Sequence, residues 1–337
     1  MKKVLIENSK YSILLYILIE KKWQDTILVI NKETINLEFI SSLKKYFLEV
    51  YVLNTISPIS KSKDISFIIK RYIVFLLDLF KLTYIFFKNK IIFNKGVIVY
   101  GNDNLSYFIL RRKKIILIED GLVNYYHKQM RKNRIYNILK NIIYLKPPFY
   151  KSYGYSKFVK KIYLTNKSNN KDLEKKEKIV NLKKLWQQKN QMEKKRILSL
   201  YNLEENYFNK VEGKKVILLT QPLSEDNLIS ENKKIMLYKK IISRYSENDL
   251  VIKVHPREKT NYTDFFPKIT IIKDKIPFEL YYLQGIKLEK VVTIFSTAVL
   301  AVKEEILVDF FGTEIDDEIL KKIGSLEHII KRNVFLK

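Results

Sequence analysis

Two short segments of the chain combine side chains that could do acid–base chemistry. In "LVIKVHP" (250–256) an apolar run ends in Lys253, His255 and Pro256. Proline restricts the residue before it to extended geometry, which suits a histidine leaving the end of a strand. In "IEDG" (118–121) Glu119 and Asp120 follow another apolar run, and adjacent carboxyl groups raise each other's pKa and suit a general base. A structural histidine and a solvated turn acid are the alternative interpretations.

Two further segments carry polar side chains after apolar runs. In "FST" Ser296 and Thr297 open a predicted helix, where hydroxyl groups and free backbone N–H groups bind phosphate well. A plain helix cap at Ser296 is the alternative. In "TQPLSED" Gln221 and Asp226 belong to a polar loop. Ligands of open α/β sheets bind beyond the carboxyl ends of strands, so these loops are candidate sites.

Composition excludes several classes of protein. The chain has no cysteine and three histidines, so we expect no metal site and no disulfide. No dinucleotide or P-loop glycine motif occurs, and we expect no cofactor. The formal net charge of +27 favours contact with polyanions such as nucleic acid, anionic lipid or anionic glycans, unless it reflects lysine-rich codon usage alone.

The elements that must position these residues alternate between strand and helix. Strands are predicted within 2–7, 25–31, 50–55, 96–103 and 113–121, and again within 214–222, 249–256, 269–274, 290–302 and 306–314. This alternation predicts parallel sheets of Rossmann type in an α/β protein. We expect an N-terminal domain at 1–165, a helical connector at 166–212 and a C-terminal domain at 213–337. The apolar stretch 72–87 contains Asp78 and Lys81, which favours a buried or surface-lying helix.

The motifs "IEDG", "TQPLSED", "KVHP", "PFE" and "FST", in this order, resemble those of bacterial sialyltransferases of glycosyltransferase family 52. The resemblance implies a GT-B fold, in which two Rossmann-like domains face a cleft. It implies CMP-sialic acid as donor and a glycan or glycolipid acceptor, such as a terminal galactose of lipooligosaccharide. It also implies an inverting, metal-independent transfer and allows a homodimer.

The resemblance also assigns roles to individual residues. Lys253, His255 and Pro256 match a motif whose histidine contacts the CMP phosphate, with Lys253 adding positive charge and a protonated His255 acting on the leaving group. Glu279 matches the acid that binds ribose, and Ser296 and Thr297 match the hydroxyl pair on the phosphate. Gln221 joins this donor-binding set. The candidates for the base are Asp226, ranked first, and then Glu119 or Asp120.

Other interpretations remain open at this point. They are a GT-B enzyme that uses another nucleotide sugar, a basic nucleic-acid-binding protein, and an inactive interaction protein of the same fold. No nucleic-acid-binding motif is visible, so we expect no nucleic-acid partner. The start of the chain does not resemble a signal peptide, which predicts a cytoplasmic protein. Lysines flanking 72–87 and within 171–196 could hold it to the anionic inner face of the cell membrane.

Overall fold

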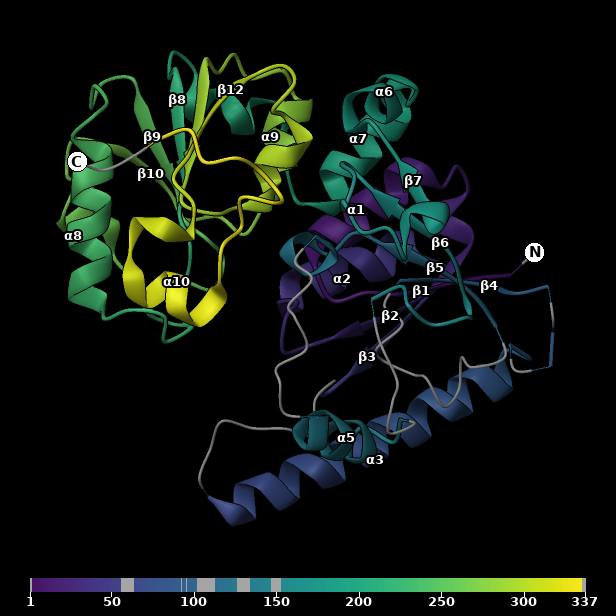
Figure 1. Cartoon of the computed structure of the whole chain (residues 1–337). Coiled ribbons are helices and arrows are strands. Elements are labelled where there is room, and N and C mark those ends of the chain that lie inside the picture. The colour runs from purple at the N-terminus through teal and green to yellow at the C-terminus, as the bar shows by residue number, and fades with distance from the viewer. Residues whose placement is uncertain are drawn as a thin grey trace. The chain divides into compact units, whose positions relative to one another are not determined.

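The computed structural model describes residues 2–55, 64–91, 93–94, 96–101, 113–125, 134–146 and 153–334. It divides into two compact units, Met1–Glu204 and Glu205–Lys337. Each unit is built on its own sheet, and every recorded strand pairing is parallel (Figure 1). The prediction of two Rossmann-like α/β halves is confirmed.

The first sheet has the order β3-β2-β1-β4-β5-β6-β7. Its strands are β1 Lys3–Ile6, β2 Thr26–Asn31, β3 Glu49–Leu53, β4 Ile98–Gly101, β5 Lys114–Ile118, β6 Val159–Leu164 and β7 Glu177–Ile179. All residues of β2 are buried, as expected for an apolar run covered on both faces. The strand order reverses between β1 and β4, and such a switch point is where open α/β sheets bind ligands.

The second sheet has the order β10-β9-β8-β11-β12. Its strands are β8 Val216–Leu219, β9 Leu250–Lys253, β10 Thr270–Ile272, β11 Lys290–Thr293 and β12 Leu307–Phe310. Leu219 is paired with Lys253 on one side and with Thr293 on the other, so three strands end at the same level. The switch point of this sheet lies between β8 and β11.

Helices follow most strands, and several begin at capping side chains. They are α1 Lys10–Ile19, α2 Leu37–Tyr46, α3 Ile65–Lys88, α5 Arg134–Ile143, α6 Leu182–Gln187, α7 Gln191–Leu200, α8 Glu231–Ile242, α9 Phe278–Leu283 and α10 Asp317–Ile323. The Ser9 hydroxyl accepts from the Ser12 N–H at the start of α1, and Asn190 and Glu193 form a reciprocal capping box at the start of α7. The Ser9 cap fixes where the chain turns after β1, and the Asn190 cap fixes where it turns between α6 and α7.

The segment 166–212, expected as a helical connector, is shared between the two units. Its strand β7 pairs with β6 in the first sheet. Helix α6 packs on α1 and α7 packs on α2, and the first unit extends to Glu204. The boundary between the units therefore lies at 204/205.

Helix α3 contains the apolar stretch 72–87 and lies with one face buried, as predicted. Its buried residues include Phe75, Leu82 and Phe86. Asp78 is also buried, where its carboxylate accepts hydrogen bonds from the Asn54 and Thr55 N–H groups after β3. Within the described residues, no helix is both long and apolar enough to cross a lipid bilayer.

Candidate active site

The carboxyl ends of β8, β9 and β11 gather most of the predicted donor-binding residues. Gln221 follows β8, His255 follows β9 and Ser296 follows β11. Because β9 and β11 flank β8, the backbones at His255 and Ser296 are separated by two strand spacings, roughly 10 Å. This edge can present an imidazole and hydroxyl groups to one polar ligand.

His255 is half-buried and oriented by hydrogen bonds on two sides. Its backbone N–H donates to the Thr220 hydroxyl at 3.0 Å and to Glu258 Oε1 at 3.2 Å. Its Nδ1 accepts from the Arg257 N–H at 3.2 Å. In the neutral imidazole the proton is therefore assigned to Nε2, which leaves Nε2–H as a donor.

Burial, assisted by the neighbouring Arg257 charge, lowers the pKa of His255 to about 4. The imidazole of the unliganded protein is thus neutral near pH 7, whereas the sequence led us to expect a protonated one. The physical reason is desolvation beside cations, which disfavours the charged form. A neutral His255 can donate a hydrogen bond from Nε2 but is a poor proton donor.

A buried ionic cluster beneath His255 joins the loops after β8 and β9. Lys234 of α8 is fully buried and contacts Glu225 at 3.1 Å, Glu231 at 3.0 Å and Glu258 at 3.8 Å. Glu258 also accepts from the Tyr262 hydroxyl at 2.5 Å and from the Thr220 hydroxyl. Burial raises the pKa of Glu258 to about 7. Sequence reasoning missed this cluster, whose members read as ordinary surface charges.

Lys253 is committed to an internal ion pair. Its ammonium lies 2.9 Å from Asp274 Oδ1 and 5.1 Å from the centre of the Tyr281 ring, and the residue is buried. Burial lowers the pKa of Lys253, whereas Lys253 and the hydroxyl groups of Tyr281 and Tyr207 hold the pKa of Asp274 far below its usual value. Lys253 therefore neutralises Asp274 in this structure and is not a free charge for a phosphate.

The remaining predicted donor-binding residues lie at the same edge or beside it. The Ser296 hydroxyl accepts from the Ala298 N–H at 3.4 Å as the cap of a short 3-10 helix, Thr297–Ala301, and both Ser296 and Thr297 are half-exposed. Gln221 is largely buried and Pro256 is exposed. Glu279 is buried near the start of α9, where its charge acts on Lys253.

Asp226 forms a two-pronged ion pair with Arg257. Nη1 lies 2.5 Å from Oδ1 and Nη2 lies 2.9 Å from Oδ2. Both carboxylate oxygens therefore already accept from one guanidinium, so a sugar hydroxyl would compete with Arg257 for them. Arg257 was not singled out by the sequence.

In the first unit, the two acids of "IEDG" have different surroundings. Glu119 is buried, and its Oε2 accepts from the Thr165 N–H at 2.6 Å and from the Thr165 hydroxyl at 2.9 Å. It therefore ties β5 to the end of β6. Asp120 is exposed to solvent, and its Oδ1 accepts from the Ser12 hydroxyl at 3.1 Å. Gly121 follows the two acids and, at φ +82°, adopts the left-handed conformation that turns the chain after Asp120.

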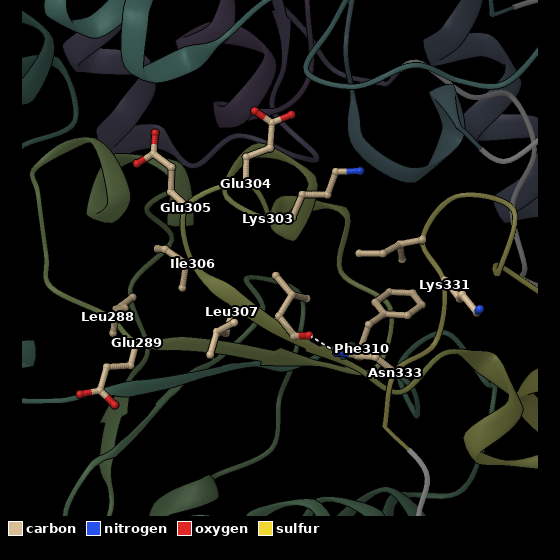
Figure 2. A pocket seen from close by; sticks show the side chains of 12 residues that line it. Leu288, Glu289, Lys303, Glu304, Glu305, Ile306, Leu307, Phe310, Lys331 and Asn333 are labelled. Carbon is tan, nitrogen blue, oxygen red and sulfur yellow. Dashed lines mark hydrogen bonds between the residues drawn. The ribbon is translucent and has the colours of Figure 1, made fainter.

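The described residues contain no group of three or more histidine or acidic side chains that could hold a metal ion. A pocket of about 710 Å³ lies elsewhere in the second unit, beside the edge strand β12 (Figure 2). Leu288, Glu289 and Leu307 line it near the amino ends of β11 and β12. None of the predicted site residues lines this pocket, so it has no part in the chemistry argued below.

Comparison with known proteins decides the family. The model of glycosyltransferase family 52 matches residues 26–316. The chain belongs to this family. It is also 40% identical to an uncharacterized protein of Haemophilus influenzae over 237 residues, which are 68% of this chain and 73% of that protein. The protein is therefore a glycosyltransferase.

Solved structures similar to this glycosyltransferase share its fold at low sequence identity. A 2,6-sialyltransferase of Photobacterium sp., in a complex with CMP and lactose, matches with a TM-score of 0.61 and 13% identity, over 99% of this chain and 78% of that one. A galactoside α-2,3-sialyltransferase of Photobacterium phosphoreum matches with a TM-score of 0.57 and 14% identity, over 99% and 97%. A UDP-GlcNAc 2-epimerase of Methanocaldococcus jannaschii matches with a TM-score of 0.52 and 14% identity, over 92% and 84%.

Proposed function

We propose that this glycosyltransferase transfers sialic acid from CMP-sialic acid to a hydroxyl group of a terminal galactose, or a similar sugar, on a surface glycan such as lipooligosaccharide. The transfer inverts the anomeric centre and needs no metal ion. One observation carries the proposal: a neutral histidine donor and a pair of hydroxyl groups flank β8 at the switch point of the second sheet. This set suits a single phosphate group better than a diphosphate.

On the donor side, His255 and the hydroxyl residues bind the CMP phosphate. The Nε2–H of His255 donates to a phosphate oxygen, and Ser296 and Thr297 add hydroxyl donors and the backbone N–H groups of the short 3-10 helix. As the bond from the anomeric carbon to the phosphate oxygen breaks, that oxygen gains negative charge. Preorganised hydrogen-bond donors stabilise this charge without a metal ion.

On the acceptor side, we assign the base to Asp120. Glu119 and Asp226 have their oxygens occupied by Thr165 and Arg257. Asp120 is exposed, and its hydrogen-bond partners among the described residues are the hydroxyl groups of Ser12 and Ser9. The Asp120 carboxylate takes the proton of the acceptor hydroxyl as its oxygen attacks the anomeric carbon. CMP leaves with the bonding electron pair, and the proton on Asp120 passes to water after product release.

The peripheral membrane contact is also a proposal. Helix α3 exposes Ile65, Ile69, Ile73, Leu77, Phe80, Tyr84 and Phe87, each at least half accessible to solvent. Their spacing of three or four residues forms one continuous apolar stripe. The exposed lysines Lys70, Lys81 and Lys88 belong to the same helix. An amphipathic helix of this kind can lie in the interface of an anionic leaflet.

Nucleotide binding tests the donor assignment independently of the acceptor. We expect CMP to raise the melting temperature of the protein more than UDP does, because binding to the native state shifts unfolding by mass action. His255→Ala should weaken the CMP effect. An equal or larger effect of UDP, unchanged in His255→Ala, would contradict the proposal.

A further inference from the structure

A buried carboxyl group in the first unit lies outside the chemistry described so far. Glu7 directly follows β1 at the switch point of the sheet, and only 1% of its surface is exposed. Within the described part of the chain, neither Oε1 nor Oε2 has a hydrogen-bond partner. A buried ionised carboxylate without partners is costly, so such a group demands an explanation.

The neighbouring strand β4 shows where the carboxyl group of Glu7 lies. Gly101 ends β4 and is paired with Ile6. A Cβ atom placed on Gly101 would lie 3.1 Å from Glu7 Oε1 and 2.0 Å from the Ile6 carbonyl oxygen. The carboxyl group of Glu7 therefore lies beside Gly101 at the end of β4, and a side chain at position 101 would displace it.

Asp120 follows β5 on the far side of β4. Ser12 of α1 joins the two regions, because its hydroxyl donates to Asp120 Oδ1 at 3.1 Å and lies near Glu7. The pKa of Glu7 is raised well above its usual value, first by burial and then by the Asp120 charge. The Asn8 N–H and the Ser12 hydroxyl offset part of this rise, although neither makes a hydrogen bond of good geometry to Glu7.

Among the described residues, the other groups packed against the pair supply no competing charge to Glu7. Burial raises the pKa of Asp120, and the hydroxyl groups of Ser9 and Ser12 at the start of α1 offset part of this rise. Strand β4 contributes Gly101, which has no side chain, and β2 contributes the Val29 carbonyl oxygen, which accepts from the Glu7 N–H at 3.1 Å. Glu119 of the β5 end is engaged with Thr165. Among the described residues, Asp120 is the charged group whose field acts on Glu7.

We propose that Glu7 and Asp120 act as one pair of carboxyl groups that holds a single proton, with the proton on Glu7 and the negative charge on Asp120. Glu7 is then a positioning residue: by staying neutral it leaves one negative charge at this site, and that charge is on the exposed member. The inference rests on the proposed function, in which Asp120 accepts the proton of the sugar hydroxyl. During transfer that proton moves to Asp120 and later to water, and the proton on Glu7 stays in place.

The coupling gives the pair a specific pH dependence. Interacting carboxyl groups lose their protons in two steps that belong to the pair. The first step creates the active monoanion. The second removes the proton from Glu7, and the resulting second charge repels the carboxylate of an anionic sugar such as sialic acid. Activity should therefore rise through the first step and fall through the second.

A carboxyl titration tests the pair without any assay of activity. The protein is labelled with ¹³C at the glutamate carboxyl carbons, and the Glu7 signal is identified by its loss in Glu7→Gln. We expect a midpoint above the ordinary range of glutamate, and a fall of roughly one pH unit in Asp120→Asn, because a like charge nearby has been removed. Glu119→Gln identifies the signal of the adjacent acid and should leave the Glu7 midpoint in place. If Glu7→Gln fails to fold, the Glu7 signal is assigned in another way. It is the glutamate signal with a raised midpoint that is still present in Glu119→Gln and whose midpoint falls in Asp120→Asn.

An unchanged Glu7 midpoint in Asp120→Asn would overturn the proposal, and so would an ordinary midpoint in the wild-type protein. The pH profile of kcat provides the second readout. Glu7→Gln should lose the decline at high pH and keep its rate at lower pH, whereas an identical profile in both proteins would contradict the positioning role. If the enzyme shows no activity with CMP-sialic acid, the proposed function fails, but the titration still decides whether the pair exists.

Discussion

The guanidinium of Arg257 spans the carboxylate of Asp226, with contacts of 2.5 Å and 2.9 Å to its two oxygens. Both oxygens of Asp226 already accept from this guanidinium, so a sugar hydroxyl would have to compete with Arg257 to reach them. The geometry therefore separates three acids that the sequence alone presents as alternatives, and it favours Asp120.

The first prediction compares these acids by substitution. Asp120→Asn should lower kcat by about two to four orders of magnitude, the usual contribution of a general base. Asp226→Asn should reduce kcat much less, because it removes an ion pair and leaves Asp120 intact. Steady-state kinetics with saturating donor measures both effects. Full activity in Asp120→Asn together with a large loss in Asp226→Asn would reverse the assignment.

The second prediction concerns His255. His255→Ala should lower kcat by about two to three orders of magnitude, as the loss of one preorganised donor does elsewhere. His255→Gln keeps an N–H donor and should retain more activity. Because the pKa of His255 is about 4 in the unliganded protein, its titration should cause no inflection in the kcat/KM profile between pH 6 and pH 8. A histidine midpoint near 6.5 in the unliganded protein, followed by proton NMR, would refute the neutral imidazole.

The third prediction links Glu258 to stability. Its pKa is about 7 in the folded protein and near 4.5 in the unfolded chain. Its contribution to the free energy of unfolding is therefore fully present below pH 4.5 and is lost as the pH rises through 7. A pKa shift of this size corresponds to a loss of stability on the order of 3 kcal/mol. Glu258→Gln should therefore be less sensitive to pH between 5 and 8 in chemical denaturation. Parallel stability curves for the two proteins over this range would argue against the raised pKa.

The fourth prediction concerns the exposed stripe of α3. The wild-type protein should co-sediment with anionic liposomes at low salt and be released by high salt, since each basic residue near such a surface contributes about 1 kcal/mol. Leu77→Ser with Phe80→Ser should reduce binding. Met236→Ser, which changes an exposed apolar residue of α8, is the matched control. Equal binding to neutral vesicles, or none to either type, would remove the membrane proposal. Dimers in solution that the paired substitution dissociates would instead assign the stripe to a second copy of the chain.

Much of the fold can be predicted from the sequence because the strands are short apolar runs separated by helical periods. The segments 2–7 and 249–256, for example, contain β1 and β9. The segment 166–212 is harder, because β7 is a three-residue edge strand with two exposed residues and a polar sequence. Its pairing with β6 depends on tertiary contacts that no local pattern encodes.

The site is predictable where a polar residue follows a strand. This rule gives His255 and Ser296, and it would also have given Glu7, which follows β1 in the same way as Glu119 follows β5. The partners of these residues are not predictable. Asp274 and Lys234 read as surface charges, and only the fold brings Asp274 to Lys253 and Lys234 to Glu258. Sequence spacing likewise gives no sign that Arg257 forms an ion pair with Asp226.

The central claim is tested most directly by incubating the purified protein with CMP-sialic acid and lactose, or another terminal galactoside, in excess EDTA. Liquid chromatography with mass spectrometry follows both the release of CMP and the mass of the acceptor. We predict stoichiometric CMP and sialylated acceptor, at a rate that falls sharply in His255→Ala and in Asp120→Asn. No transfer from CMP-sialic acid, together with UDP release and sugar transfer from a UDP-sugar under the same conditions, would contradict the account.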